Sequence, residues 1–389
     1  MNKVYVSRIR YFFILECLWL ASCNHPDIQK EETPESFVEL FDAFWHGINA
    51  NYVFWDIDST NWDQVYTKFH LKFDQLDIDN EDDVRHSISY FREITKFMID
   101  GHASISFQHP LLFDSLIEPL FERKKSLGLS SRAYDYQLLD TAYLDSGFSI
   151  GSDFSNILNG NPLTVITGTI DSNIIFFSCN FFGLSESYYS LNDNIAKYVI
   201  KRFFNLLEKE DSRGVIIDVR NNPGGDLADL NFLIGMFIDE PLTIGYSQYK
   251  NGVDRLSFTP WISAQINPET RKSIEVPIIV LGDNYSASLS EMVISAIQTM
   301  PKGVFIGETT FGATSPVIPF EIYNSGSFDI NGFLNVRLSS GKFKNLNDDI
   351  FEGRGVPPDV VVRHSSNNFF RGIDTQLTYC LQYLDNILN

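Results

Sequence analysis

Apolar residues in the first quarter of the chain recur at helical spacing. Between residues 36 and 100 they return every three or four positions, with polar residues between them. This spacing places the apolar side chains on one face of a helix. We therefore predict a small N-terminal helical subdomain over 36–107. The positions that carry this pattern are Phe37, Leu40, Phe41 and Phe44, then Val65, Phe69 and Leu71, then Ile88, Phe91 and Ile94.

The pattern changes after Pro162. Short apolar runs rich in β-branched and aromatic residues, as in buried strands, alternate with longer stretches at helical spacing. This alternation predicts an α/β core over 163–389, whereas residues 108–162 show no clean period and stay unassigned. The expected strands are 163–166, 174–177, 215–219, 242–246, 276–281, 304–306, 333–338 and 360–362, and the expected helices are about 190–208, 226–238, 286–300 and 369–387.

The N-terminus has the pattern of an export signal. A basic start precedes an apolar stretch over 11–21, which is shorter than the roughly 20 residues that span a bilayer. The following Leu20-Ala21-Ser22-Cys23 resembles a bacterial lipobox, in which the cysteine is acylated. We predict a lipoprotein signal peptide over 1–22, lipidation of Cys23 and a flexible tether over 23–35. An ordinary signal peptide or a buried first helix is the alternative interpretation.

The charge of the chain limits its partners. It has 30 Lys and Arg against 50 Asp and Glu, a net charge of −20. Such an excess of negative charge argues against binding to nucleic acid and to anionic lipid headgroups. We therefore expect contact with a membrane only through the lipid anchor, in the bacterial cell envelope, on the periplasmic or surface face of the outer membrane. No close pair of Cys or His has the spacing of a metal site, so we predict no metal and no organic cofactor.

A first candidate site lies where an expected strand ends near Val219. A polar turn follows, and Gly224 and Gly225 precede an expected helix. Glycine lets the backbone approach a ligand closely, and the free N–H groups of a helix N-terminus suit an anion or a developing oxyanion. A plain turn with Asp226 as the helix N-cap explains the same residues without chemistry.

A second candidate lies between the strand 276–281 and the helix 286–300. Ser288 occurs in Ser286-Ala287-Ser288-Leu289-Ser290-Glu291, at the first turn of the helix. A serine there is held by a strand, and the N–H of Leu289 can help stabilise an oxyanion. However, Ser288 and Glu291 also fit a capping box, which needs no catalysis.

The third candidate is Asp100-Gly101-His102, where a helical pattern meets the strand-like run 105–107. Histidine is the usual base that activates a serine near neutral pH. One histidine among seven carries little information by itself.

Together the three junctions resemble the C-terminal processing, or tail-specific, serine peptidases, a family that includes the tricorn core protease. The resemblance covers about 166–363, and 36–107 more loosely. It implies a crotonase/ClpP-like α/β core and a serine peptidase that cleaves peptides or unfolded protein segments through an acyl-enzyme. The PDZ module of many relatives is not evident in 108–162. The matching motifs are Ile217–Gly225 (family pattern D-x-R-x-N-x-G-G), Ser286–Glu291 (S-A-S-A-S-E), Ile306–Gly312 (v-G-E-x-T-F-G) and Glu352–Asp359 (E-G-x-G-V-x-P-D).

One departure from the family pattern bears on the catalytic base. In the Ser–Lys branch the base is the lysine directly after T-F-G, where this chain has Ala313. A methyl group cannot accept a proton, so a Ser–Lys dyad at that position is excluded. In the tricorn-like branch the base is a histidine from the N-terminal part, assisted by a glutamate of the E-G-x-G-V motif. The resemblance therefore implies Ser288 as nucleophile, His102 as base and Glu352 as the assisting acid.

The resemblance also implies the supporting residues. Gly225 and Leu289 would form the oxyanion hole, and Gly224 and Ser104 would contact substrate. Ser104 is also a candidate for a hydroxyl that bridges Glu352 and the imidazole. With an imidazole base, the acidic limb of activity is expected near the ordinary histidine pKa of about 6.5.

Three other interpretations of the sequence stay open. The chain could be an inactive relative that acts as a lipid-anchored binding or scaffold protein. It could be an enzyme acting on acyl thioesters, because crotonase-like cores support that chemistry too. It could also be a structural surface lipoprotein, although the ordered motifs would then have no purpose. The expected partner is a peptide or protein substrate, and the sequence carries no signal for an oligomeric state.

Overall fold

The computed structural model describes residues 33–129, 136–270, 272–318 and 326–388. The predicted signal peptide over 1–22, the predicted lipidation site Cys23 and most of the predicted tether over 23–35 lie outside the described residues. Within those ranges, no helix combines the length and the apolar character needed to cross a membrane.

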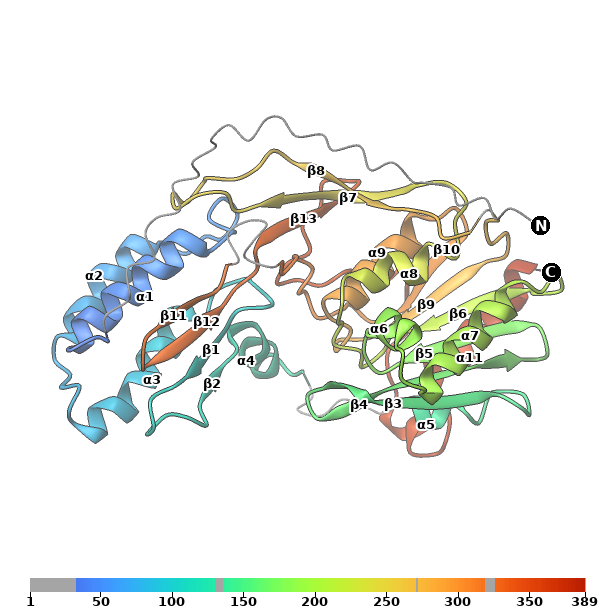
Figure 1. Ribbon diagram of the computed structural model, residues 1–389, viewed down its shortest axis with the longest axis horizontal. Coiled ribbons are helices and arrows are strands. Elements are labelled where there is room, and N and C mark those ends of the chain that lie inside the picture. The colour runs from blue at the N-terminus through green and yellow to red at the C-terminus, as the bar shows by residue number, and fades with distance from the viewer. Residues whose placement is uncertain (1–32, 130–135, 271, 319–325, 389) are drawn as a thin grey trace, which may run out of the picture.

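A seven-stranded mixed sheet forms the centre of the larger unit, at the right of Figure 1. Its middle strands run parallel, and the β3–β4–β5 edge is antiparallel. This arrangement confirms the predicted α/β core. In sheet order the strands are β14 (Val360–Val361), β10 (Gly303–Gly307), β9 (Ile278–Gly282), β6 (Gly214–Asp218), β5 (Ile174–Cys179), β4 (Asn161–Ile170) and β3 (Ser149–Leu158).

Helices cover both faces of this sheet. Alternate strand residues point to opposite faces, so Phe177 packs with α7 while Phe176 packs with α11. The central strands are buried on both faces, and they therefore appear in the sequence as continuous apolar runs. The covering helices are α7 (Ile195–Leu207), α8 (Ala228–Ile234) and α9 (Leu289–Thr299) on one face and α11 (Thr375–Leu388) on the other, with the short α5 (Tyr136–Asp140), α6 (Leu184–Tyr189) and α10 (Ser366–Phe369) beside them.

The N-terminal unit packs helices against a small antiparallel sheet, at the left of Figure 1. Its core is rich in phenylalanine, and the predicted helical pattern over 36–100 corresponds to its three helices. The elements are α1 (Phe37–Asn51), α2 (Trp62–Phe73) and α3 (Glu81–Thr95), with a sheet in the order β11 (Phe328–Ile330), β12 (Leu334–Arg337), β1 (Ser104–Phe107) and β2 (Leu116–Ile117).

This sheet differs from the domain boundaries expected from sequence. β11 and β12 come from within 163–389, yet they pair with β1 and share its core. A two-stranded β1–β2 ribbon would be marginal alone, so the N-terminal unit recruits a hairpin from far along the chain. Residues 108–162 likewise form no separate module. Their elements, β2, α4 (Pro119–Ser126), α5 and β3, extend the two units.

A third sheet connects the two units. β7 (Leu242–Tyr249) pairs with β8 (Ile262–Ile266) and β13 (Gly341–Asn345), and in Figure 1 this sheet runs across the top of the molecule. Buried Lys342 places its Nζ 2.6 Å from Asp56, just after α1. Arg255, in the β7–β8 connection, forms a 2.5 Å ion pair with Asp63 of α2. These contacts fix the sheet to the N-terminal unit.

A buried ion cluster fixes the loop that follows β6. The guanidinium of Arg220 contacts the carboxylates of Asp218, Asp140 and Asp374, and all four side chains are buried. The Tyr136 ring lies 3.8 Å from the guanidinium carbon. Removing one partner of such a cluster leaves uncompensated buried charge, so the cluster specifies where this loop begins.

Candidate active site

Ser288 occupies a strained turn between β9 and α9. Its φ of 55° and ψ of −119° lie in a region that residues with a side chain rarely adopt. The neighbouring chain holds this turn: the Asn222 carbonyl accepts hydrogen bonds from Ala287 N (3.1 Å) and Ser290 Oγ (2.8 Å). This conformation is that of a nucleophile elbow, which presents the serine hydroxyl to a substrate.

Glu291 links this turn to the loop after β10. Its buried carboxylate accepts the Ser288 N–H at 3.0 Å, as a capping box requires, and also Thr310 Oγ1 at 2.5 Å. The N–H groups of Gly312 and Ala313 donate to the same carboxylate at 2.7 Å each. Burial raises the pKa of Glu291, and these donors oppose the rise. The capping residue is thus also the anchor of the Thr310–Ala313 loop.

His102 lies opposite Ser288, although 186 positions separate them in sequence. Its Nε2 is 3.1 Å from Ser288 Oγ. With the proton on Nδ1, Nε2 accepts the serine hydroxyl, which is the arrangement that a general base needs. The structure therefore brings together the nucleophile and base expected from the motifs.

Two residues to which the motif analysis gave no role, Ser339 and Asp100, orient the imidazole. Ser339 Oγ lies 3.4 Å from His102 Nδ1 and donates to Asp100 Oδ1 at 2.8 Å. Buried Asp100 also accepts Ser339 N (2.8 Å) and His102 N (2.9 Å). The hydroxyl of Ser339 thus bridges Asp100 and the imidazole. The predicted Ser104 begins β1 opposite Arg337, and it is not among the described residues that line the cavity.

Glu352 binds the backbone of the loop that carries His102. Its buried carboxylate accepts Gly101 N at 2.5 Å, Ser315 N at 2.9 Å and Thr314 Oγ1 at 3.2 Å. These contacts join the Asp100–His102 loop of the N-terminal unit to the α/β core. Burial raises the pKa of Glu352, and the nearby charge of Asp100 raises it further. Its contacts make Glu352 a positioning residue that fixes the loop beside His102.

Asp100, His102 and Glu352 each offer one potential metal-ligand atom, and these atoms lie within 4.8 Å of one another. Each carboxylate already accepts hydrogen bonds from the chain on both oxygens. The imidazole faces hydroxyl groups on both nitrogens. The donor set therefore suits a hydrogen-bonded anchor better than it suits a cation.

The environment of His102 favours the neutral imidazole. Burial lowers its pKa to about 4, and the positive charge of Arg337 acts in the same direction. Burial also raises the pKa of Asp100. The expectation of an ordinary value near 6.5 therefore does not fit this site.

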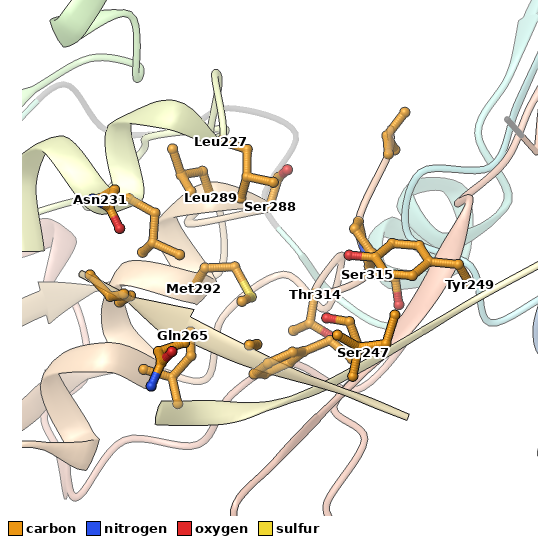
Figure 2. Close-up of a pocket in the computed structure, with 18 of the residues that line it drawn as sticks. Leu227, Asn231, Ser247, Tyr249, Gln265, Ser288, Leu289, Met292, Thr314 and Ser315 are labelled. Atoms are coloured by element: carbon orange, nitrogen blue, oxygen red, sulfur yellow. The ribbon is translucent and has the colours of Figure 1, made fainter. Parts of the chain in front are cut away.

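The hydroxyl of Ser288 opens on a cavity of about 370 Å³. Figure 2 shows Ser288 beside Leu289, Leu227 and Met292, with Ser315 and Tyr249 across the space. Gly225 and Leu289 both line the cavity, and within the described ranges neither backbone N–H has a protein acceptor. These two groups can receive an oxyanion, as the motifs implied.

Close packing leaves no room for a side chain at Gly224 or Gly225, the two glycines of the first motif. A Cβ at Gly225 (φ 150°) would lie 1.9 Å from the Phe182 carbonyl oxygen, and one at Gly224 (φ 98°) would lie 2.6 Å from Ser288 Cβ. Gly224 is not among the residues lining the cavity. The structure therefore gives Gly224 a role in supporting Ser288, where the motif implied substrate contact.

The segment that contains Ser288 matches a known protein family. Residues 187–362 match the family model described as Peptidase family S41. This segment of the α/β core belongs to peptidase family S41. The match includes Ser288, Gly225 and Glu352, whereas His102 precedes it.

Two curated relatives of this chain are named as a C-terminal processing protease and a tail-specific protease. It is 29% identical over 154 residues to the carboxy-terminal processing protease CtpA of Bacillus subtilis, covering 40% of this chain and 29% of CtpA. It is 28% identical over 173 residues to the tail-specific protease of Haemophilus influenzae, covering 44% and 23%. The chain thus spans less than a third of the length of either relative.

Solved structures extend the likeness to both units. A structure from Parabacteroides merdae, described as that of a candidate peptidase, superposes with a TM-score of 0.69 at 20% identity, covering 90% of this chain and 97% of the other. Mature CPAF superposes with a TM-score of 0.56 at 11% identity, covering 90% and 96%. At these identities the likeness shows a shared mixed α/β fold, including the N-terminal helical region.

Close packing around Ala313 leaves no room for the lysine that the Ser–Lys branch has at this position. A Cβ added to Gly101 would lie 2.5 Å from Ala313 Cα and from the Gly312 carbonyl oxygen. The histidine loop is therefore packed directly on the position that would carry the lysine, and Ala313 is only 3% exposed.

We predict that Ala313→Lys does not substitute for the histidine base. In a His102→Gln background, peptide hydrolysis should stay at the His102→Gln level, because a lysine at 313 has no room beside Gly101. The added side chain should also lower the free energy of unfolding by about 1–3 kcal/mol, as overpacking does. Peptide hydrolysis and urea unfolding measure the two effects. A double variant that recovers activity would contradict this steric account.

A second prediction concerns pH. His102 acts as a base only when neutral, which holds above its pKa, so a pKa lowered to about 4 extends activity into acid. The acidic limb of kcat/KM for a peptide should lie near pH 4, well below 6.5. Circular dichroism over the same range separates titration from acid unfolding. A limb near 6.5 in the folded protein would show that the imidazole is not held neutral.

Proposed function

We propose that the protein is a serine peptidase that cleaves peptides or unfolded protein segments through an acyl-enzyme. The observation that carries the proposal is the 3.1 Å contact between His102 Nε2 and Ser288 Oγ at the edge of the cavity. The strained serine turn and the two unpaired N–H groups beside it support the same reaction. The proteolytic relatives add support, although the chain covers only part of their length.

The proposed reaction begins at Ser288. Its Oγ forms a bond to the peptide carbonyl carbon while the hydroxyl proton passes to His102 Nε2. The Gly225 and Leu289 N–H groups receive the negative charge that develops on the carbonyl oxygen. The C–N bond then breaks as Nε2 returns the proton to the leaving amine. Water attacks the acyl-enzyme by the same route, which restores the serine and releases an acid.

The positioning residues act through the imidazole. The Asp100 carboxylate and the Ser339 hydroxyl lie on the Nδ1 side of His102, where positive charge appears once Nε2 is protonated. A hydrogen bond to Nδ1 also holds the tautomer in which Nε2 can accept a proton. Glu352 holds Gly101 and so maintains the distance between the two units. This arrangement supports a Ser–His mechanism, as in the tricorn-like branch.

The non-catalytic alternative is a scaffold protein that keeps the fold. A scaffold has no need for a serine held at a φ of 55° with its hydroxyl against an imidazole. Backbone strain of this kind costs about 1–3 kcal/mol and persists where function requires it. The conformation of Ser288 therefore favours the enzyme over the scaffold.

Cleavage specificity tests the proposal. The full chain is incubated with a mixed peptide library, an unfolded protein and a panel of acyl thioesters, and the products are identified by mass spectrometry. We expect peptide cleavage that falls at least about 10³-fold in Ser288→Ala, the usual scale for loss of a nucleophile. Thioester cleavage without peptide cleavage would identify the other crotonase-like chemistry. A folded protein that cleaves neither would support the scaffold.

A further inference from the structure

The cavity beside Ser288 has an unusual charge for this protein. Acidic residues outnumber basic residues by 50 to 30 in the chain, yet no Asp or Glu is among the described residues that line the cavity. Most lining side chains near Ser288 are apolar or uncharged. Because His102 is neutral, Arg337 is the one charged side chain in the described lining at neutral pH.

Arg337 has no partner among the described residues, unlike the buried cations Arg220, Lys342 and Lys250. Arg220 and Lys342 contact carboxylates, and buried Lys250 donates to the Asp254 and Arg255 carbonyls. For the guanidinium of Arg337, no ion pair or hydrogen bond with any described residue is found, and the residue is exposed. With no carboxylate of the described ranges beside it, the guanidinium has five N–H donors available to a ligand.

Two strands fix Arg337 on the His102 side of the cavity. It ends β12 directly opposite Ser104, which follows His102 by two residues. Two residues after Arg337 comes Ser339, whose hydroxyl contacts the imidazole of His102. Gly225, Leu289 and Ser288 line the same cavity. Because His102 returns its proton to the leaving amine, the part of a substrate beyond the scissile bond lies on the Arg337 side.

We propose that Arg337 binds a carboxylate in the leaving segment of the substrate. The segment would carry either a free C-terminal carboxylate or an Asp or Glu side chain a short distance beyond the scissile bond. Guanidinium matches carboxylate geometry with two parallel hydrogen bonds, which adds orientation as well as attraction. Arg337 is then a specificity-determining residue that selects acidic leaving segments, and this role rests on the peptidase function proposed above.

The experiment uses one cleaved peptide in four forms with short leaving segments. The first pair differs only in a C-terminal carboxylate or a C-terminal amide. The second pair, both amidated, has Glu or Gln in the leaving segment. At pH 7.5 the full chain should hydrolyse at least one carboxylate form about tenfold faster in kcat/KM than its neutral match, on the scale of a charge-assisted hydrogen bond. The favoured pair identifies the source of the carboxylate.

Variants assign that preference to Arg337. In Arg337→Gln the ratio within each pair should fall to about one, whereas Arg337→Lys should retain part of it. Because each ratio compares two substrates on one protein, changes in His102 or in folding cancel. Arg371→Gln removes an exposed arginine that does not line the cavity, and it should keep the wild-type ratio.

The outcomes distinguish the two proposals. Hydrolysis of all four peptides by the full chain at equal rates would overturn the role of Arg337 and leave the peptidase function standing. A preference that persists in Arg337→Gln would also overturn that role. If the folded chain cleaves none of the peptides, the peptidase function and the role that rests on it both fail.

Discussion

The contact between His102 and Ser288 depends on how two separately packed units meet. The nucleophile is held in the α/β core, by β9, α9 and the carbonyl of Asn222. The base belongs to a loop that closes the N-terminal helical unit, whose phenylalanine-rich core is distinct. A hydroxyl becomes a nucleophile only if its base stays within hydrogen-bond reach. The interface between the units is therefore as important to the chemistry as either residue.

Three buried carboxylates hold the two sides of that interface, and the contact of Glu352 crosses it. Glu291 fixes the Thr310–Ala313 loop on the serine turn, and Glu352 receives the backbone of Gly101 from across the interface. Asp100 binds Ser339, just beyond β12, so the recruited hairpin also holds the histidine. Buried charges are costly unless hydrogen-bonded, and each of these carboxylates accepts at least three donors. The free-energy cost of burying these carboxylates is offset only when their donors are in place. Folding of the interface is therefore coupled to the geometry of the site.

Much of this arrangement could be predicted from the sequence because it depends on local patterns. The strands β5, β6 and β9 are continuous apolar runs, and the motifs around Gly225 and Ser288 fall at strand ends, where turn chemistry is visible in the residues themselves. Ser339 could not be found in this way. It follows an ordinary strand, and its role arises because β12 pairs with β1, a long-range pairing that no local pattern specifies. The same pairing places Ser104 opposite Arg337 and adds residues from 163–389 to the N-terminal unit. The pKa of His102 depends on burial, which spacing does not reveal.

The most direct test of the account is the rate at which a fluorophosphonate probe labels Ser288, because the probe needs an activated hydroxyl but no particular substrate. The second-order rate constant is measured by intact-protein mass spectrometry for the full chain, His102→Gln and Ser288→Ala, with the exposed His46→Gln as the matched control. The account predicts labelling that is abolished in Ser288→Ala, falls about 10²–10⁴-fold in His102→Gln and keeps its rate in His46→Gln. Labelling of His102→Gln at the wild-type rate would contradict it.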